Sequence, residues 1–159
     1  METISFEKIS LPNGLDVILH QDRPLPLVAV NVWYHVGSKD EEPGKTGYAH
    51  LFEHLMFEGS KHHNSSQFEP LIKVGATLNG STTTDRTNYW ENLPSNYLEL
   101  ALWLEADRMV NLVLREDEVA LEREVILEER RSRTDNDPSA LLSEQMSATL
   151  YLAHPYRIP

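Results

Sequence analysis

The pentapeptide HLFEH, which begins at His50, places three groups with metal or acid–base chemistry close together. On a helix, positions i and i+4 lie about 40° apart in azimuth and about 6 Å apart along the axis, so His50 and His54 can point at one cation. Neutral histidine nitrogen is a common zinc ligand. Glu53 directly precedes His54, so it is poorly placed as a third ligand. It can instead hold a water molecule and accept its proton. The order is the reverse of the His-Glu-x-x-His metal motif.

Two explanations of this pentapeptide are open. In the simpler one, an amphipathic helix carries two surface histidines and a glutamate, a pattern that arises often by chance. The neighbouring residues favour a functional explanation, because they surround the polar groups with apolar bulk. These neighbours are Leu51, Phe52, Leu55, Met56 and Phe57. A helix this apolar is expected to be buried, and buried His and Glu side chains need partners. A metal ion is the simplest partner for all three.

A third metal ligand is expected from the charged segment 115–133. Glu122 and Glu129 share one helical face, because seven residues return within about 20° of the starting azimuth. That face also carries two β-branched apolar residues. Glu124 and Glu128 instead fall on a mixed face, where they can pair with arginine. Most charges of this segment are expected to belong to a solvated, salt-bridged helix.

Three polar residues beyond the pentapeptide are weaker candidates. Glu58 continues the strip, but the rise from His50 to Glu58 is about 12 Å, too long for three side chains of one helix to reach one ion. We expect a solvated or capping role for Glu58. His62 and His63 lie in a polar stretch and are expected to be exposed loop histidines.

The surrounding segments have the patterns of strands and helices. Asn13-Gly14 between two β-prone runs predicts a hairpin, and the β-branched and aromatic run 27–36 predicts a strand with much of both faces covered. Ser66 can cap a short helix that Gly75 stops. The expected strands span residues 4–10, 15–21, 27–36, 77–84 and 86–93. The expected helices span about residues 47–59, 67–74, 94–112, 115–133 and 139–152.

The order of these elements indicates the fold class. Strands come first and helices follow, with an early hairpin, so we expect an α+β fold with a mostly antiparallel sheet packed against helices. A parallel doubly wound fold would alternate strands and helices. We find no repeat and no internal linker, so residues 1–159 are expected to be one domain or an incomplete piece of a larger one.

Composition excludes several classes of protein. The chain has 14 Lys and Arg against 25 Asp and Glu, a formal net charge of −11, which disfavours a nucleic-acid binder. No apolar run approaches the ~20 residues of a membrane span. Cysteine is absent, so a metal has to be held by the 7 histidines and the carboxylates. The N-terminus has no signal-peptide pattern. This fits a cytoplasmic protein and equally a periplasmic one whose signal peptide has been removed, so the compartment stays open.

At His50-x-x-Glu53-His54 the sequence resembles the pitrilysin/insulinase family of zinc peptidases, the inverzincins. Three stretches, in the order expected for the family, carry the resemblance across most of the chain. They are GYAHLFEHLMFEGS (47–60), GATLNGSTTTDRTNY (75–89) and EREVILEE (122–129). The resemblance implies the α/β roll of that family. It also implies that residues 1–159 are the N-terminal, zinc-binding peptidase domain, in incomplete form.

The resemblance also implies roles for single residues. It implies one zinc ion per chain, held by His50, His54 and Glu129. Glu53 matches the general base, and Glu122 matches a supporting acid that orients the site. Residues 79–84 resemble an edge strand beside the zinc, to which a substrate segment adds as a β-strand. The implied substrate-binding residues are Asn79, Gly80, Ser81 and Thr82. Gly80 stands where the family usually has Ala, which predicts a looser strand.

Together these features predict a zinc-dependent endopeptidase that hydrolyses peptides or unfolded segments, through a metal-activated water and a Glu general base. The alternative is a non-catalytic structural or partner subunit of the same family, but such relatives typically lose motif residues that this chain keeps. Family members have two related halves, and this chain is shorter than one half. We therefore expect its partner to be the remaining polypeptide or a second homologous chain, and we expect residues 1–159 alone to be inactive.

Overall fold

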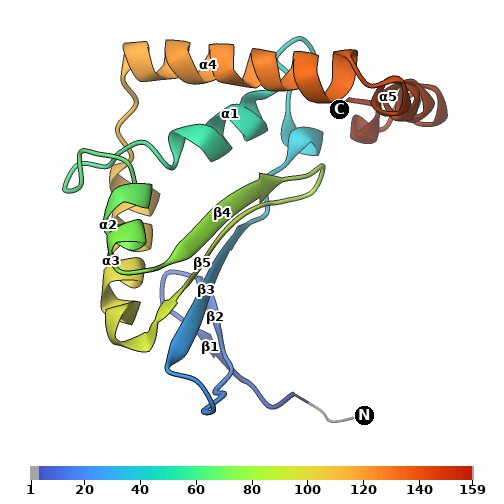
Figure 1. The fold of residues 1–159 in the computed structure, drawn as a ribbon. Coiled ribbons are helices and arrows are strands. Elements are labelled where there is room, and N and C mark those ends of the chain that lie inside the picture. The colour runs from blue at the N-terminus through green and yellow to red at the C-terminus, as the bar shows by residue number, and fades with distance from the viewer. Residues whose placement is uncertain (1–3, 159) are drawn as a thin grey trace.

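In a computed structural model that describes residues 4–158, a first group of strands is followed by two α-helices, two more strands and the remaining helices. The strands are β1 (Glu7–Ser10), β2 (Asp16–Leu19), β3 (Leu27–Tyr34), β4 (Thr77–Thr82) and β5 (Thr87–Pro94). Among the described residues, β1 and β2 form a separate hairpin, and the other three form a sheet of order β3-β5-β4 in which both pairings are antiparallel. The α+β class with a mostly antiparallel sheet is confirmed (Figure 1).

The predicted hairpin forms at Asn13-Gly14. Gly14 has a φ of 90°, in the left-handed region that favours glycine. The Asn13 side chain accepts a hydrogen bond from the Leu15 amide over 3.1 Å. This local chemistry closes the turn, so the short sequence signal was sufficient to place it.

The helices fall where the sequence pattern places them. They are α1 (Tyr48–Leu55), α2 (Phe68–Lys73), α3 (Leu98–Asn111), α4 (Glu116–Arg130) and α5 (Pro138–Leu150). Helix α1 ends at Leu55 instead of near Gly59, because the next amides bond three residues back: Phe57 N donates to His54 O and Glu58 N to Leu55 O. Such bonds tighten the last turn of a helix.

The short helix α2 lies within its predicted range, 67–74, and is one residue shorter at each end. The Phe68 amide donates to Ser66 Oγ over 3.3 Å, which satisfies one of the free amides at the start of the helix. Gly75 follows the helix with a φ of 81° and donates its amide to Ile72 O. A residue with a side chain would be strained at that φ, so glycine accounts for the stop.

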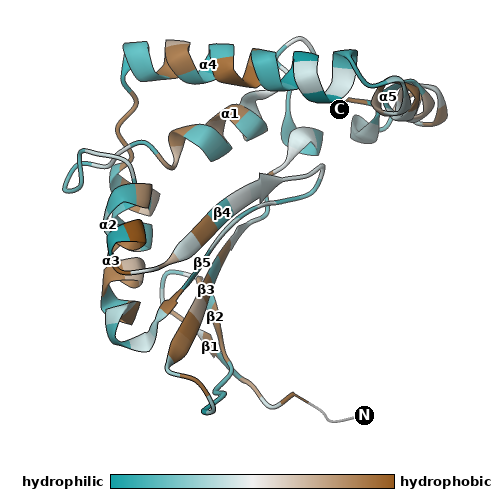
Figure 2. Ribbon diagram, in the orientation of Figure 1, coloured by the Kyte–Doolittle hydropathy of each residue, from teal (hydrophilic) through white to brown (hydrophobic). Residues whose placement is uncertain are grey.

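Strand β3 differs from its prediction in one respect. It ends at Tyr34, and its side chains alternate between exposed and half-buried. Val28 and Val30 pack on the core, whereas Leu27 and Trp33 on the other face are 57% and 56% exposed. The prediction that both faces are largely covered is wrong for the described residues. Figure 2 shows apolar segments along β3, and the helices cover only one side of this sheet.

Two apolar clusters fix the helices on the sheet. Leu71, Leu93 and Leu104 are at the centre of the first, which joins α2, β5 and α3. Met56, Phe57 and Tyr89 form the second, which joins the end of α1 to β5. Helix α1 packs between the end of β4 and helix α4. Helix α4 lies alongside α1 (Figure 1). None of the helices in residues 4–158 is long and apolar enough to cross a membrane.

Candidate metal centre

Helix α1 carries the pentapeptide, and the residue that caps its start is Gly47, whose φ is 92°. The amides of Gly47 and Ala49 donate to the Glu41 carboxylate over 2.9 and 2.7 Å. A carboxylate there satisfies free amides and complements the positive end of the helix dipole. The sequence analysis missed Glu41, because it lies too far before the helix to match a capping pattern.

His54 is oriented by a residue of another helix. Its Nδ1–H group donates to Glu122 Oε2 of α4 over 2.8 Å. Both side chains are largely buried, with 20% and 13% of their surface exposed. A carboxylate can only accept, so Nδ1 carries the proton of this bond and Nε2 is the nitrogen available to a metal.

His50 faces the second glutamate of α4. Its Nε2 atom lies 3.6 Å from Glu129 Oε2, and the two histidine rings stand edge-on with centroids 4.9 Å apart. One ligand atom from each of His50, His54 and Glu129 lies within 4.8 Å of the other two. These donors fit the nitrogen and oxygen ligands of a tetrahedral zinc site with an open position.

The Glu129 carboxylate provides a test of that fit. Its Oε2 atom is buried and has no hydrogen-bond partner among the described residues. The nearest cation is the exposed Arg133, whose Nη1 lies 3.4 Å away. A buried carboxylate oxygen is costly without a partner, and a cation between Glu129 and the two histidines would supply one. The residues therefore fit the metal.

Glu53 lies on the same helix but contacts the sheet. Its carboxylate is nearly buried, with 9% of the residue exposed, and Thr82 Oγ1 at the end of β4 donates to its Oε2 over 2.5 Å. A Cβ on Gly80 would lie 3.1 Å from Glu53 Oε1. Glycine thus lets β4 approach the carboxylate closely.

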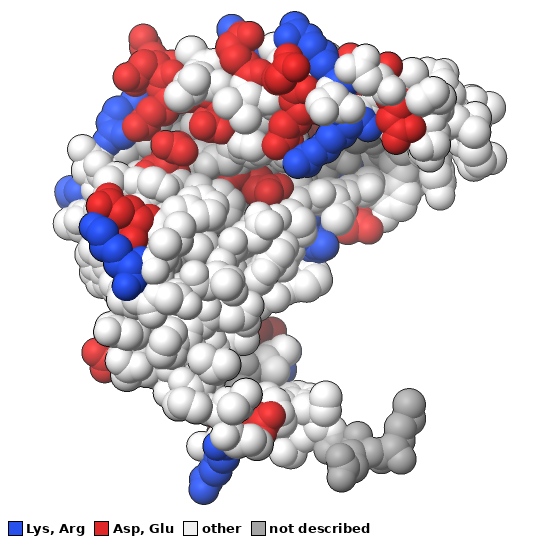
Figure 3. All heavy atoms as spheres, in the orientation of Figure 1, with Lys and Arg blue, Asp and Glu red and all other residues white. Residues whose placement is uncertain are grey.

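Burial shifts the pKa of two groups at this site. The pKa of His50 is lowered, first by burial and then by the neighbouring His54, which favours the neutral ligand form. The pKa of Glu58 is raised, first by burial and then by the charges of Glu122 and Glu118. Glu58 is half-buried, which differs from the solvated position that was one of its two expected roles. Figure 3 shows how acidic side chains gather over α4 and its surroundings.

The glutamates assigned to the mixed face of α4 lie outside the cluster. Glu124 pairs with Arg123 at 3.1 Å, and Glu128 pairs with Arg131 at 3.1 Å. Both are exposed, so their pairing with arginine is as predicted. Their position follows from the helical period alone, because one residue turns a side chain by about 100°.

The four strand candidates lie on β4, which pairs only with β5 in the described part of the chain. Thr82 contacts Glu53 directly. Ser81 Oγ points elsewhere and donates to Asn88 Oδ1 over 2.9 Å, and the Asn79 side chain accepts from the Gly80 amide over 2.8 Å. The structure thus brings Thr82 and Gly80 to the site, and leaves the other two on the strand beside it.

The sequence of this chain matches the model of a known protein family. Residues 16–159 match the sequence model of the family described as Insulinase (Peptidase family M16). The chain belongs to this family. The match covers all three helix and strand segments that carry the candidate site, from α1 through β4 to α4.

Zinc proteases of bacteria are similar to this chain over nearly its whole length. The zinc protease PqqE of Helicobacter pylori is 40% identical over 152 residues, which cover 94% of this chain and 34% of the relative. An uncharacterized zinc protease of Mycobacterium leprae is 36% identical over 153 residues, 96% of this chain and 34% of the relative. This insulinase-family chain therefore spans about a third of the length of these relatives.

A solved structure agrees with the fold. The crystal structure of a protease from Helicobacter pylori superposes with a TM-score of 0.93 at 38% identity. The matched region covers 98% of this chain and 38% of that protein. The arrangement of α1, β4 and α4 in this insulinase-family chain therefore belongs to an architecture known from a larger protease.

Proposed function

We propose that this chain forms the zinc centre of a metalloendopeptidase, with one zinc ion held by His50, His54 and Glu129. The observation that carries the proposal is the convergence of these three side chains from two helices, with a buried oxygen on Glu129 that has no hydrogen-bond partner among the described residues. The names of the relatives, zinc proteases, support the same chemistry. Glu122 would hold the tautomer of His54 and raise its basicity as a ligand.

A zinc ion in this position would polarise a scissile carbonyl and lower the pKa of water. The residues of the chain would supply the remaining functions. Glu53 would hold the attacking water, accept its proton on a carboxylate oxygen and pass that proton to the leaving amine. The Thr82 hydroxyl donates to Glu53 Oε2 and would fix the orientation of the carboxylate at the end of β4.

Strand β4 would hold the substrate. It lies next to Glu53, and among residues 4–158 its outer edge has no paired strand. A peptide added to this edge would be bound through its main chain, which suits an enzyme that accepts many sequences. Residues 79–82 would thus present the peptide to the metal. Peptides and unfolded segments, which can adopt the extended form, are the proposed substrate class.

Because the chain spans about a third of its relatives, the activity of the whole protein is a further proposal. We propose that the remaining polypeptide, or a second homologous chain, encloses the substrate over β4. Catalysis needs the reacting atoms held in a near-attack arrangement and water excluded. Residues 1–159 alone are expected to bind zinc and to have little peptidase activity.

The test combines metal analysis with a peptide assay. The purified chain is loaded with zinc and dialysed, its metal content is measured, and cleavage of a fluorogenic peptide is followed with and without the remaining polypeptide. We expect one zinc per chain and chelator-sensitive cleavage only in the complete assembly. Absence of bound zinc would contradict the metal centre. Zinc binding without cleavage in the complete assembly would favour the non-catalytic subunit.

A further inference from the structure

The segment that follows helix α1, Met56–His62, is held by the C-terminal end of α3. The Lys61 amide donates to Asn111 O over 2.9 Å, and the Val113 amide donates to Gly59 O over 3.2 Å. Two adjacent side chains of α3, Asp107 and Arg108, add bonds from within the core. Both are buried, with 6% and 2% of the residue exposed. Sequence reasoning did not single out either residue.

Asp107 receives four hydrogen bonds on its two oxygens. Ser60 Oγ and the His62 amide donate to Oδ2 over 2.5 and 3.1 Å. His62 Nδ1 and Asn111 Nδ2 donate to Oδ1 over 2.6 and 2.8 Å. Burial alone would raise the pKa of Asp107, but these hydrogen bonds outweigh it and hold the pKa well below its usual value. His62 is an exposed loop histidine, as expected, with 55% of its side chain exposed. Its bond to Asp107 was not predicted.

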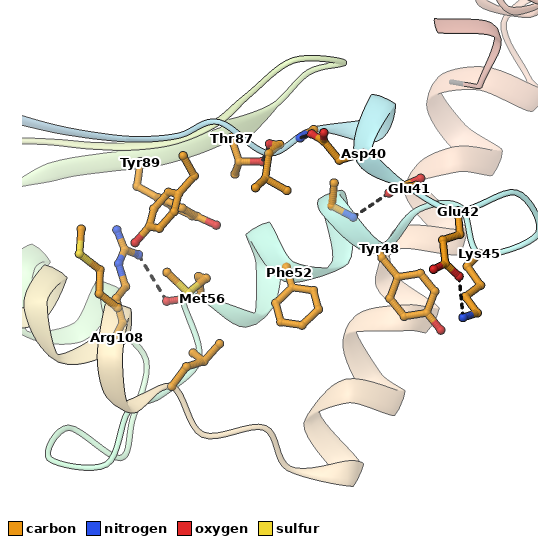
Figure 4. A pocket seen from close by; sticks show the side chains of 16 residues that line it. Asp40, Glu41, Glu42, Lys45, Tyr48, Phe52, Met56, Thr87, Tyr89 and Arg108 are labelled. Carbon is orange, nitrogen blue, oxygen red and sulfur yellow. Dashed lines mark hydrogen bonds and ion pairs between the residues drawn. The ribbon is translucent and has the colours of Figure 1, made fainter. Parts of the chain in front are cut away.

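Arg108 contacts the end of α1 itself. Its Nη1 group donates to the Met56 carbonyl over 3.3 Å (Figure 4). A cation at this end of a helix satisfies a free carbonyl and complements the negative end of the dipole. The guanidinium also lies over the ring of Tyr89, with its carbon 4.2 Å from the ring centroid. Arg108 thus joins α1 to β5 as well as to its own helix.

Two acidic side chains hold Arg108 in this position. Glu105 accepts two of its N–H groups, one of them from Nε over 3.0 Å. Glu91 Oε1 of β5 lies 3.7 Å from Nη2. All three residues are buried, with 2–4% of each exposed. A planar guanidinium with two bonds to one carboxylate has a defined orientation, unlike the mobile ammonium of lysine.

We propose that Asp107 and Arg108 are positioning residues for the metal cluster, acting through the segment that ends α1. This inference rests on the proposed function. His54 lies two residues before Met56, the residue whose carbonyl Arg108 binds, and Glu53 lies three before it. Because α1 has only 8 residues, a shift at its end moves both side chains. Neither positioning residue touches the cluster, so each acts by fixing the backbone of α1.

A purely structural role would have a different signature. Loss of Arg108 or Asp107 contacts would then lower the stability of the chain, while molecules that remained folded would bind zinc as tightly as before. A positioning role predicts weaker binding and a changed ligand geometry in folded molecules. Supporting residues around metal ligands typically contribute about 10- to 100-fold in metal affinity, and we expect about tenfold here.

The experiment compares Arg108→Lys and Asp107→Asn with Arg123→Lys in the whole chain. Lysine keeps the charge of Arg108 but cannot reproduce its two hydrogen bonds to Glu105 together with the one to the Met56 carbonyl. An asparagine amide at 107 would turn an NH2 group toward two donors. Arg123 is exposed on α4 and pairs only with Glu124 in the described structure, so it is the control. Zinc affinity is measured by competition with a chromophoric chelator, and folding by circular dichroism.

Cobalt is the second probe, because its visible absorption reports ligand geometry. We expect about tenfold weaker zinc binding and an altered cobalt spectrum in Arg108→Lys and Asp107→Asn, with neither change in Arg123→Lys. If those variants do not fold, Ser60→Ala, which removes one bond to Asp107, should show a smaller change of the same kind. Wild-type affinity and spectrum in folded variants would overturn the positioning role. A wild-type chain without zinc affinity would instead overturn the proposed function.

Discussion

The Nδ1–H group of His54 donates to Glu122 Oε2 over 2.8 Å, although 68 residues separate the two in sequence. The bond links α1 to α4 at the candidate metal centre and leaves His54 Nε2 free. Seven residues along α4, Glu129 faces His50, with its Oε2 atom 3.6 Å from His50 Nε2 and no hydrogen bond between them. One helix thus provides both a candidate ligand and the residue that orients another ligand, so the packing of α4 on α1 determines the site.

Substitution of neighbouring glutamates at the end of α4 tests the ligand assignment. Glu129→Gln should weaken zinc binding severely, since it removes the charge of the only carboxylate in the cluster. Glu128→Gln should have little effect, because Glu128 is exposed and pairs with Arg131. Metal analysis after dialysis measures both. The reverse result would mean that the residue of α4 that faces the two histidines is misassigned by one position.

Removal of the partner of His54 should lower zinc affinity without abolishing it. Glu122→Ala leaves the Nδ1–H group without its acceptor, so the ring can rotate and its basicity falls; we expect about 10- to 100-fold weaker binding. Glu124→Ala is the matched control two residues along the helix, since Glu124 is exposed. Equal zinc affinities for the two variants, by chelator competition, would exclude an orienting role for Glu122.

Glu53→Gln separates catalysis from metal binding. The amide is nearly isosteric and cannot accept a proton, so turnover in the complete assembly should fall about 10²–10⁴-fold. Zinc content should remain that of the wild type, because Glu53 lies outside the ligand cluster. Turnover is followed with a fluorogenic peptide. Wild-type rates in this variant would show that another group accepts the proton.

The buried Glu91 should make stability depend on pH. Burial, and then the neighbouring Glu105, raise the pKa of Glu91 from 4.5 to about 9. The folded chain therefore retains a proton that the unfolded chain releases. The stabilisation from this proton is complete below pH 4.5 and is lost as the pH rises toward about 9.

Glu91→Gln imitates the protonated carboxyl group and does not titrate. As the pH is raised from 5 to 8.5, the urea unfolding midpoint of the variant should rise relative to that of the wild type. Other titrating groups are common to both proteins, so the difference between them isolates Glu91. Parallel curves for the two proteins across this range would mean that Glu91 is ionised in the folded chain.

Gly37 should be required for the close approach of two chain segments. A Cβ there would lie 2.3 Å from Thr83 O at the end of the β4–β5 turn. Gly37→Ala should therefore destabilise the chain by about 1–3 kcal/mol, the usual cost of overpacking. Gly59→Ala is the control, because its Cβ would meet only ordinary contacts at 3.6 Å and beyond. Equal thermal midpoints for the two variants would refute this prediction.

Local patterns in the sequence were sufficient for the elements and for part of the site. The i and i+4 spacing of His50 and His54 follows from helical geometry alone, as does the shared face of Glu122 and Glu129. The Asn13-Gly14 turn and the stop at Gly75 follow from glycine conformations that few other residues adopt. The order of these elements also indicated the α+β class.

Only the tertiary structure decided which faces meet. Helical periodicity places Glu129 on a face but does not say that this face packs against His50, since the packing depends on apolar contacts between distant segments. The same holds for Thr82 beside Glu53, and for Asp107 and Arg108 at the end of α1. Their hydrogen bonds join residues 29 to 52 positions apart. No local period encodes such a pairing, so the sequence determined the parts of the site and the packed core determined their arrangement.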